Sequence, residues 1–378
     1  MDRRSLLLGL AALAVAQTAC GRSHAGALAI TTLKDALPPQ LLSDFKDSLT
    51  DPAPLKVRTQ KSWVSLWQTL QEWHQANAED SLPSPVADWV CVSDYWLFAA
   101  IQQQLILPLS EVRTVPGWEN LPESWSTLLQ RNSQGFVSET GTVWASPYRW
   151  GSLVMVYDSR PFAKWGWQPT AWSDLLRPEL RQRLALPNHP RIVLGLLLKS
   201  LGYSVNDLDP ETHGDLRSML DALVPQVRVY ATSSYLESLI VGDVALAVGW
   251  SAEIQPVLSR YRYLKAIAPD PGTLLSADVW VKPNPTMGQP QETSPSPIDQ
   301  KWLSYWWSPK VVTPLSLFAR GLSPLLLSPD SIQVAVTTAE TAIAPTSEQL
   351  AQSEFILPLE AAAIARYEAL WRQLRGRK

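Results

Sequence analysis

The chain has 378 residues, of which 46% are hydrophobic and 18% charged, and its formal net charge is -3. This length exceeds a single minimal core and predicts one large or two medium domains. The nearly balanced charge gives no reason to expect nucleic acid or an acidic membrane surface as a partner. Tryptophan occurs 18 times, and we expect most copies to fill the core and a few to line a concave site.

The N-terminus has the pattern of an export signal. Two arginines precede an apolar stretch, residues 6–16, that is shorter than a membrane span. The arginine pair resembles a twin-arginine signal, and a general secretion signal is the alternative. Cleavage is expected either before Cys20, which would then carry a lipid anchor, or near Ala25. Residues 1–25 are therefore predicted to be an export signal.

Cysteine usage excludes two ways of stabilising the fold. Cys20 and Cys91 are the only cysteines, and the run WVCV places Cys91 in a buried strand. A disulfide framework and a thiolate metal site both need more cysteines than this. Stability must therefore come from the core.

Strand and helix patterns alternate from the start of the mature chain. LAITTL (28–33) predicts a buried strand, and PPQLLSDFKDSL predicts a helix that begins at two prolines. KSWVSLWQTLQEWHQ has tryptophans and leucines at helical spacing, which predicts an amphipathic helix with its aromatic stripe facing the core. ADWVCVSDYW predicts a buried strand that runs into a helix, with Ser93 or Asp94 as the N-cap.

The alternation continues to the C-terminus. Helices are predicted for RIVLGLLLKSLG, HGDLRSMLDALV and SSYLESLIVGD. Further short strands are predicted at residues 152–158, 183–187, 244–250 and 278–283. This order indicates an α/β architecture with mostly parallel sheets. The proline-rich stretch 283–297 predicts a solvated loop.

The sequence contains no set of residues typical of an enzyme. Its four histidines are widely separated, and no HExxH, G-x-S-x-G, P-loop or GxGxxG pattern occurs. We therefore expect no catalytic residue, no bound metal and no cofactor. His189, at the end of a predicted strand, either faces a cleft or is an ordinary exposed histidine.

The stretch SPYRWGS (146–152) places aromatic and charged side chains at the beginning of a predicted strand. Strand alternation puts Tyr148 and Trp150 on one face, from which they can reach a cleft or brace a hinge. Arg149 then either faces the pocket or points away into solvent or an ion pair. Both orientations of Arg149 remain open from the sequence.

Several segments in a particular order carry a resemblance to a known family. They are LPPQLLSDF, ADWVCVSDYW, SPYRWGS, TAWSDLLRPELRQRLALP, LKSLGYSVNDLDPE, GDVALAVGWSAE and SADVWVKP. This order resembles the periplasmic solute-binding proteins of ABC importers, specifically their spermidine/putrescine-binding branch. The resemblance covers nearly the whole mature chain, from about Leu28 to Leu374.

The resemblance implies a two-lobed α/β fold of the type II periplasmic binding protein kind, with the lobes joined by crossing hinge strands. The ligand is then expected in the cleft between the lobes. Lobe 1 would comprise residues 28–143 with 276–322, and lobe 2 residues 144–275 with 323–378. The resemblance also implies a monomer in the periplasm, with ABC permease and ATPase subunits as partners. Cys20 would supply an inner-membrane anchor.

The resemblance, together with the residues of SPYRWGS and the added acid Asp94, gives a set of expected ligand-binding positions. They are Asp35, Ser93, Asp94, Tyr95, Tyr148, Arg149, Trp150, Asn188, His189, Trp250, Ser276 and Asp278. Asn188 and His189 stand where the family has a pair of acids, and Ser276 stands where it has an aromatic residue. A buried ammonium group without a paired carboxylate costs several kcal/mol. A pocket with Arg149, Asn188 and His189 favours a ligand with one amine and an anionic or neutral polar end.

Two classes of function follow from these residues. The first is a transport receptor that captures a small solute, a polyamine such as spermidine or putrescine by family default, and delivers it to a membrane permease. A receptor for an amino-acid-like or organic anion solute is the variant of this function that the altered positions favour. The second is an exported accessory or sensor protein on the same fold. An enzyme is not expected, because the sequence lacks a nucleophile and a metal-ligand set.

Overall fold

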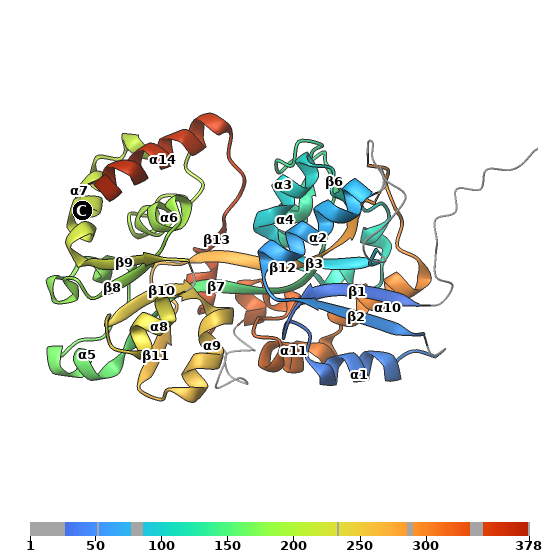
Figure 1. Ribbon diagram of the computed structural model, residues 1–378, viewed down its shortest axis with the longest axis horizontal. Helices are drawn as coiled ribbons and strands as arrows, with labels where there is room; N and C mark the ends of the chain where they lie inside the picture. The colour runs from blue at the N-terminus through green and yellow to red at the C-terminus, as the bar shows by residue number, and fades with distance from the viewer. Residues whose placement is uncertain are drawn as a thin grey trace, which may run out of the picture.

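The computed structural model describes residues 27–50, 53–76, 86–232, 234–285, 290–332 and 343–376. The predicted signal and its anchor candidate Cys20 lie outside the described residues. Figure 1 shows two halves that are joined by two long strands, β7 (Ser146–Asp158) and β12 (Leu274–Pro283). These strands run through the middle of the molecule and belong to both halves.

One large sheet extends through both halves. Its main path is β2 (Leu55–Gln60), β1 (Leu28–Leu33), β3 (Trp89–Ser93), β12, β7, β10 (Leu246–Trp250), β8 (Leu184–Pro187) and β9 (Val227–Ala231). Three further strands pair with the long ones: β4 (Ile106–Leu107) and β13 (Glu354–Phe355) with β12, and β11 (Leu264–Ile267) with β7. A separate pair consists of β5 (Gln130–Arg131) and β6 (Thr142–Val143).

The sheet is mixed, so the prediction of mostly parallel sheets was wrong for its centre. Within the halves, β1 pairs in parallel with β2 and β3, and β8 with β9 and β10. The two long strands are antiparallel to each other and to their neighbours β3 and β10. The chain leaves one half along β7 and returns along β12, which requires opposite directions. In this pairing Arg149 lies opposite Asp278.

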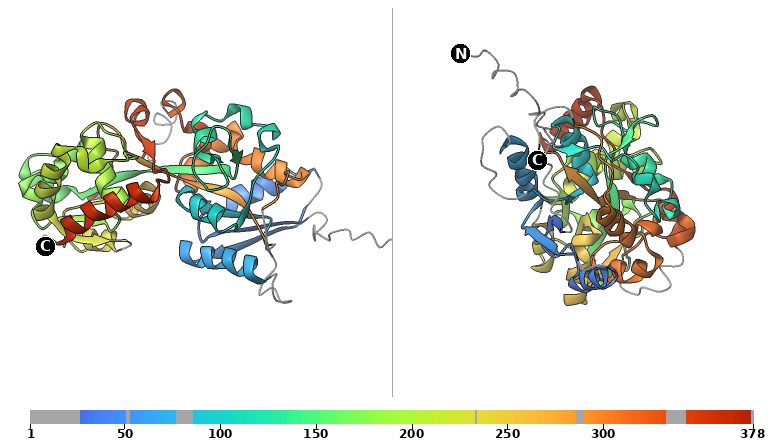
Figure 2. Two further views of the ribbon diagram at one scale, coloured as in Figure 1. Left: turned by 90° about the horizontal axis from the view of Figure 1, so that it is seen from above. Right: turned by 90° about the vertical axis from the view of Figure 1, so that its right-hand side faces the viewer.

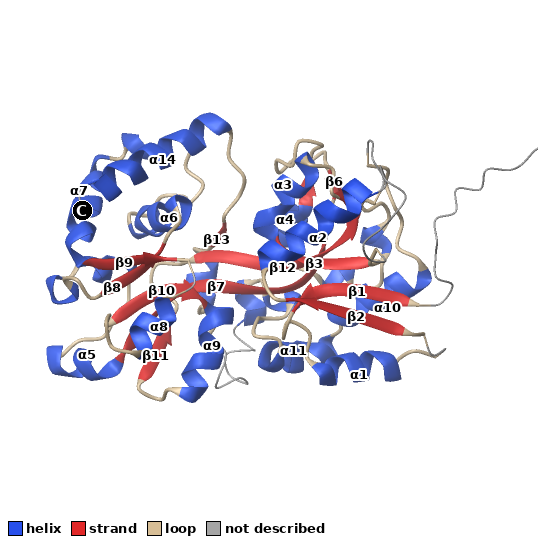
Figure 3. Ribbon diagram, viewed as in Figure 1, coloured by secondary structure: helices blue, strands red, loops and turns tan. Residues whose placement is uncertain are grey.

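Helices cover the sheet in both halves (Figure 3). The first half contains α1 (Pro39–Asp47), α2 (Trp63–Ala76), α3 (Leu97–Gln102), α4 (Ser124–Leu129), α10 (Pro297–Trp306) and α11 (Val312–Phe318). The second half contains α5 (Ser159–Trp165), α6 (Pro190–Ser200), α7 (Gly214–Leu223), α8 (Tyr235–Ile240), α9 (Ser251–Arg260) and α14 (Ala361–Gly376). A short helix, α13 (Ser347–Ala351), precedes β13. The expected N-cap is confirmed, because the Ser93 side chain accepts a hydrogen bond from the Tyr95 backbone N–H.

Figure 2 (left) shows the two halves as separate masses viewed from above, and the buried apolar residues of the two halves form separate clusters. Along β7 the change of core falls between Trp150 and Leu153, and along β12 it falls between Leu274 and Leu275. The centre of the first core is aromatic. Trp280 lies there with its ring centroid 4.9 Å from that of Tyr148, 5.2 Å from that of Trp302 and 6.5 Å from that of Trp306.

The C-terminal part of the chain departs from the predicted lobe boundaries. Residues 323–378 were assigned to the second lobe, but Leu326, Leu327 and Leu350 pack in the first core. From Leu359 onward its fully buried residues lie in the second core, while Ile343 and Ile356 already pack against that half from the side. The chain therefore crosses between the halves a third time, through β13. The crossing depends on the pairing of Glu354 with Leu274, which lies far away in the chain, so the local sequence pattern did not indicate it.

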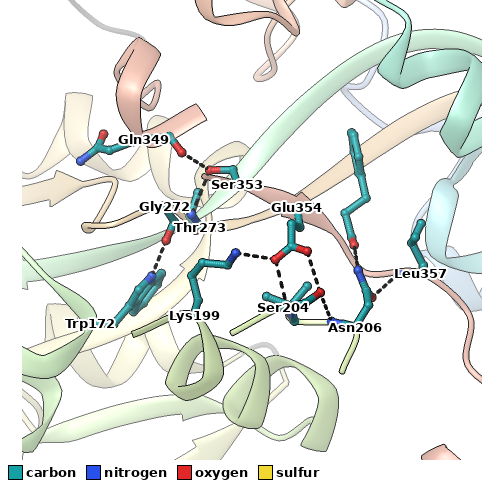
Figure 4. Close-up of polar contacts among 12 residues, drawn as sticks. Trp172, Lys199, Ser204, Asn206, Gly272, Thr273, Gln349, Ser353, Glu354 and Leu357 are labelled. Carbon is teal, nitrogen blue, oxygen red and sulfur yellow. Dashed lines mark hydrogen bonds and ion pairs between the residues drawn. The ribbon is translucent and has the colours of Figure 1, made fainter. Parts of the chain in front are cut away.

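Side chains of the second half hold this third crossing in place, as Figure 4 shows. Glu354 forms an ion pair with Lys199 of α6 and accepts a hydrogen bond from the Ser204 hydroxyl at 2.7 Å. One residue earlier, the Ser353 hydroxyl oxygen accepts from the Thr273 backbone N–H at 2.9 Å. Together with the pairing of β13 and β12, these contacts fasten the C-terminal segment to the junction of the halves.

Candidate functional site

A pocket of about 260 Å³ lies where β7 and β12 cross between the halves. Residues of both halves line it. Its wall consists of Leu33, Lys34, Asp35, Ala36, Trp63, Ser93, Arg149, Trp150, Gly151, Trp250, Ser251, Ala252, Glu253, Ser276, Asp278, Arg320 and Gly321. A concave site between two lobes, with a few polar groups among apolar ones, is typical of small-molecule binding.

Seven of the twelve predicted ligand-binding residues lie in this wall, and five do not. Those in the wall are Asp35, Ser93, Arg149, Trp150, Trp250, Ser276 and Asp278. Those outside it are Asp94, Tyr95, Tyr148, Asn188 and His189. The fold thus brings together residues that are more than 240 positions apart in the chain.

Tyr148 does not line the pocket, so the expectation that it contacts the ligand is corrected, and its position fits the other expected role of bracing the structure. Its side chain is fully buried beside Trp280, and its hydroxyl donates to the Ala36 carbonyl at 2.7 Å. That carbonyl belongs to the turn after β1, which carries Lys34 and Asp35 into the wall. Tyr148 therefore positions one segment of the pocket from behind.

Trp150 combines the same kind of bracing with a place in the wall. Its backbone N–H and C=O both pair with Leu322, at 2.9 and 2.7 Å. Its indole N–H donates to the Ser323 carbonyl at 3.0 Å. These bonds hold the segment that contributes Arg320 and Gly321 to the pocket. SPYRWGS is thus a scaffold for two loops of the site as well as part of its surface.

Arg149 lies in the pocket wall, and its guanidinium group is bound there by other groups of the protein. Its Nε and Nη2 atoms each lie 2.6 Å from one carboxylate oxygen of Asp278, and its Nη1 donates to the Ala319 carbonyl. Burial by itself lowers the pKa of Arg149, and the Asp278 carboxylate raises it above its usual range. Gly321 leaves room for the arginine stem, because a Cβ there would lie 3.0 Å from Arg149 Cδ.

The pocket wall carries nearly balanced charge. Its cationic side chains are Lys34, Arg149 and Arg320, and its carboxylates are Asp35, Glu253 and Asp278. Among the described residues, the wall contains one ion pair besides that of Arg149 with Asp278. It joins Arg320 and Asp35 at 3.8 Å, and both side chains are about half exposed. A contact of this length in solvent contributes little.

Glu253 is a wall residue that the sequence analysis missed. It lies in the first turn of α9, three residues after Trp250, and its carboxylate accepts a hydrogen bond from the Tyr235 hydroxyl. Desolvation by the surrounding wall raises the pKa of Glu253 above its usual value. Close packing fixes Tyr235, because a Cβ on Gly249 would lie 2.3 Å from the tyrosine oxygen. The signal that could have indicated Glu253 is its position as an acid in the first helical turn after Gly249 and Trp250.

Three tryptophans belong to the wall, Trp63, Trp150 and Trp250. Trp250 was predicted there, whereas Trp63 was interpreted as part of a core-facing stripe. Trp73, at the far end of α2, is buried as expected, but Trp63 is only half-buried because it stands at the start of the helix, next to the pocket. Indole faces cover alkyl chains and attract ammonium groups.

Asp94 was predicted as an additional acid of the site, but it lies behind the wall. It is 5% exposed, and its Oδ1 atom accepts from the Ala277 backbone N–H at 2.9 Å and from the Ser276 hydroxyl at 3.0 Å. Burial raises the pKa of Asp94 to about 6. The carboxyl group therefore ties the end of β3 to β12, close to the wall residue Ser276.

Asp94→Asn is expected to remove a pH dependence of stability. The pKa of Asp94 rises from 3.8 to about 6 on folding, so its contribution is fully present below pH 3.8 and is lost as pH rises through 6. This shift corresponds to about 3 kcal/mol. Urea unfolding of both proteins from pH 4 to pH 7 should show wild type losing stability relative to Asp94→Asn as pH rises. A difference that does not change with pH would contradict this.

Tyr95 and His189 meet across the two halves without lining the pocket. The Tyr95 hydroxyl lies 3.0 Å from His189 Nε2, and the two rings are edge to face at 5.5 Å. Burial, followed by the nearby charge of Arg191, lowers the pKa of His189 to about 4, so the ring is neutral near pH 7. Asn188 is exposed and outside the wall. His189 thus makes a neutral contact between the halves, outside the pocket wall.

The described residues contain neither a group of metal ligands nor a membrane-spanning helix. No three His, Cys, Asp or Glu side chains of these residues are grouped so that they could hold a metal ion. None of the helices in the same ranges combines the length and the apolar character needed to cross a bilayer.

Comparison with known sequences gives one family match and several remote relatives. A family described as bacterial extracellular solute-binding proteins matches residues 40–344. The spermidine/putrescine-binding periplasmic protein of Salmonella typhimurium is 23% identical over 278 residues, or 72% of each chain. The putrescine/cadaverine-binding protein of Pseudomonas aeruginosa is 27% identical over 120 residues, which are 31% of this chain and 34% of that protein. The latter match thus spans about a third of that relative.

Solved structures resemble this chain over nearly its whole length. The spermidine/putrescine ABC transporter substrate-binding protein of Streptococcus pneumoniae superimposes with a TM-score of 0.72 at 21% identity, covering 92% of this chain and 98% of that one. A putative spermidine/putrescine ABC transporter from Listeria monocytogenes gives 0.60 at 19% identity, covering 93% and 100%. These likenesses show the fold, a two-lobed α/β fold of the periplasmic binding protein type.

Proposed function

Because this chain belongs to the bacterial extracellular solute-binding protein family, we propose that it is the solute receptor of an ABC importer. The observation that carries the proposal is the pocket at the crossing of β7 and β12, which both halves line. A ligand held there contacts both halves at once, so its binding energy favours their approach. In this function the protein acts in the periplasm and passes its solute to a membrane permease.

The chemistry of the wall supports a ligand that carries an ammonium group. The indoles of Trp63 and Trp250 supply flat apolar faces, and Glu253 supplies a carboxylate that forms no ion pair among the described residues. Relatives with low identity are named for putrescine and spermidine. A polyamine is therefore the first ligand to test. The seven predicted residues that line the pocket are proposed to contact this ligand.

An exported accessory or sensor protein is the alternative function. It would keep the pocket and the fold but would not feed a permease. Export itself rests on the signal pattern at residues 1–25. The membrane anchor rests on Cys20, so fractionation of Cys20→Ala against wild type tests it: unchanged partition into membranes would exclude the lipid.

Isothermal calorimetry of the mature chain tests the proposed function. The panel comprises polyamines, amino acids and small organic anions, each titrated into protein shown to be folded by circular dichroism. We expect at least one member to bind with a micromolar or lower Kd. If the folded protein binds no member of the panel, the receptor proposal fails and the accessory function is favoured.

Trp250→Ala is expected to weaken binding of the ligand found in that panel at least tenfold, or about 1.4 kcal/mol. The indole covers part of the pocket wall, and its loss opens that wall to water. The matched control is Trp371→Ala, which removes a partly buried tryptophan of α14 outside the pocket. Calorimetry should show unchanged affinity for the control. If wild type and Trp250→Ala bind the ligand with equal affinity, Trp250 does not contact the ligand and the binding site lies elsewhere.

A further inference from the structure

The ion pair in the pocket wall points to the class of ligand. We propose that Arg149 acts as a built-in cation: on Asp278 it takes the place that one ammonium group of a diamine would occupy. The pocket then selects a ligand with a single ammonium group and an anionic far end over diamines and polyamines. This inference rests on the proposed receptor function.

Arg149 is held too firmly to be displaced by a ligand. Its side chain is 9% exposed, and all three guanidinium nitrogens contact acceptors of the protein, two on Asp278 and one on the Ala319 carbonyl. Its stem lies against Gly321. The two contacts to Asp278 meet at a single carboxylate oxygen, Oδ2, and contacts between ionised partners are roughly twice as strong as those between neutral ones. An incoming ammonium group would have to compete with a partner that is already in place and covalently tethered.

The remaining carboxylates offer one full site for an ammonium group. Glu253, on the second half, forms no ion pair among the described residues and is bound by a neutral Tyr235 hydroxyl. Asp35, on the first half, shares its charge with Arg320 at 3.8 Å. One ammonium group therefore finds a free partner beside Trp250, and a second would find only a shared one.

The opposite wall carries an excess of positive charge. Lys34 and Arg320 both belong to the first half and line the pocket there with a single carboxylate, Asp35, between them. Lys34 is exposed and forms no ion pair with any residue the structure describes. Such a wall repels a second ammonium group and attracts a carboxylate or another anionic group. A ligand with opposite charges at its two ends would connect Glu253 on one half with these cations on the other.

Matched pairs of ligands test the charge of the far end directly. Putrescine and 4-aminobutanoate share one ammonium group and a four-carbon chain, and they differ only in having a second ammonium group or a carboxylate. The same pairing is made for chains of three, five and six carbons, and all are titrated into the wild-type mature protein by calorimetry. We expect the tightest amino acid of the series to bind at least tenfold more strongly than the diamine of equal length.

Two sets of variants test the residues responsible. Arg149→Met frees the Asp278 carboxylate, so the affinity for the diamine should rise at least tenfold. Lys34→Gln combined with Arg320→Gln removes the anion-attracting wall and should weaken binding of the amino acid at least tenfold without weakening that of the diamine. The second set leaves the buried ion pair intact and decides the matter if Arg149→Met does not fold. Arg262→Gln, an exposed arginine outside the wall, is the control for lost surface charge.

The outcomes separate this inference from the proposed function. Equal or tighter binding of diamines by wild type overturns the role of Arg149 while leaving a receptor for cations. If neither the diamines nor the amino acids of the matched series bind, the inference about Arg149 is also overturned. The receptor function is then judged on the wider panel of ligands. Insensitivity of amino acid binding to the double variant contradicts the assignment of the anionic end.

Discussion

Replacing Trp280 by alanine is expected to lower the free energy of unfolding by about 3–5 kcal/mol. Trp280 is fully buried at the centre of the first core, in contact with the rings of Tyr148, Trp302 and Trp306. Its removal leaves a cavity among rigid rings, which cannot close around it without shifting β12. Urea unfolding followed by tryptophan fluorescence and by far-UV circular dichroism measures the loss.

Trp280→Phe is the matched control for that experiment. The indole N–H of Trp280 is buried with no hydrogen-bond partner in the structure, so phenylalanine loses ring volume but no hydrogen bond. We expect less than half the loss seen for alanine. Two results would contradict this role of the aromatic centre. One is an equal loss of unfolding free energy in Trp280→Ala and Trp280→Phe, and the other is a loss of less than about 1 kcal/mol in Trp280→Ala.

Asp278→Asn is expected to cost about 3 kcal/mol of unfolding free energy, because it leaves the Arg149 guanidinium largely buried without a counter-charge. The two side chains are 9% and 15% exposed and are held together at 2.6 Å. Thermal and urea unfolding of the ligand-free protein measure this loss. The effect on stability must be known before any change in ligand affinity of this variant is assigned to a direct contact.

The control is Asp35→Asn, a carboxylate of the same pocket whose ion pair with Arg320 is exposed and 3.8 Å long. It should change stability by less than about 1 kcal/mol. A second comparison replaces both members of the buried pair, Arg149→Met with Asp278→Leu. This double variant should recover much of the stability, since no lone charge remains buried. Failure of the double variant to recover any would assign the loss to packing instead of charge.

Elements that depend on local pattern were predictable from the sequence. The strand at 28–33 and the helix predicted for PPQLLSDFKDSL are found as β1 and α1. Two prolines at a helix start and a short apolar run indicate a helix and a strand from local sequence alone, without contacts to distant residues. The family resemblance, carried by segment order, added the two-lobed fold.

Contacts between distant segments were not predictable in the same way. SPYRWGS was correctly placed at a strand beside the cleft, but Tyr148 pairs with a residue 112 positions away and Arg149 with one 129 positions away. The second partner follows from the antiparallel register of β7 and β12, and the first from the position of the turn after β1, neither of which a single segment specifies. The orientation of Arg149 therefore stayed open until the two strands were placed side by side.

The missed wall residues illustrate a different limit. Helical spacing shows which side of α2 is apolar, but it does not show that the first residue on that side, Trp63, borders an open pocket. Glu253 resembles an ordinary acid in a first helical turn, a position that the helix dipole favours. Its role at the wall depends on the approach of the other half.

The interleaving of the chain between two cores has a consequence for its order of folding during synthesis. The second core is built mainly from one uninterrupted stretch, from Leu153 to Leu264, whereas the first core needs residues from Leu28 through to Leu350. The middle of the polypeptide can thus condense while the N-terminal strands still wait for β12 and α10 to leave the ribosome. Residues 343–376 pack in both halves, and a product truncated before them would carry an unfinished first core exposed to aggregation and proteolysis.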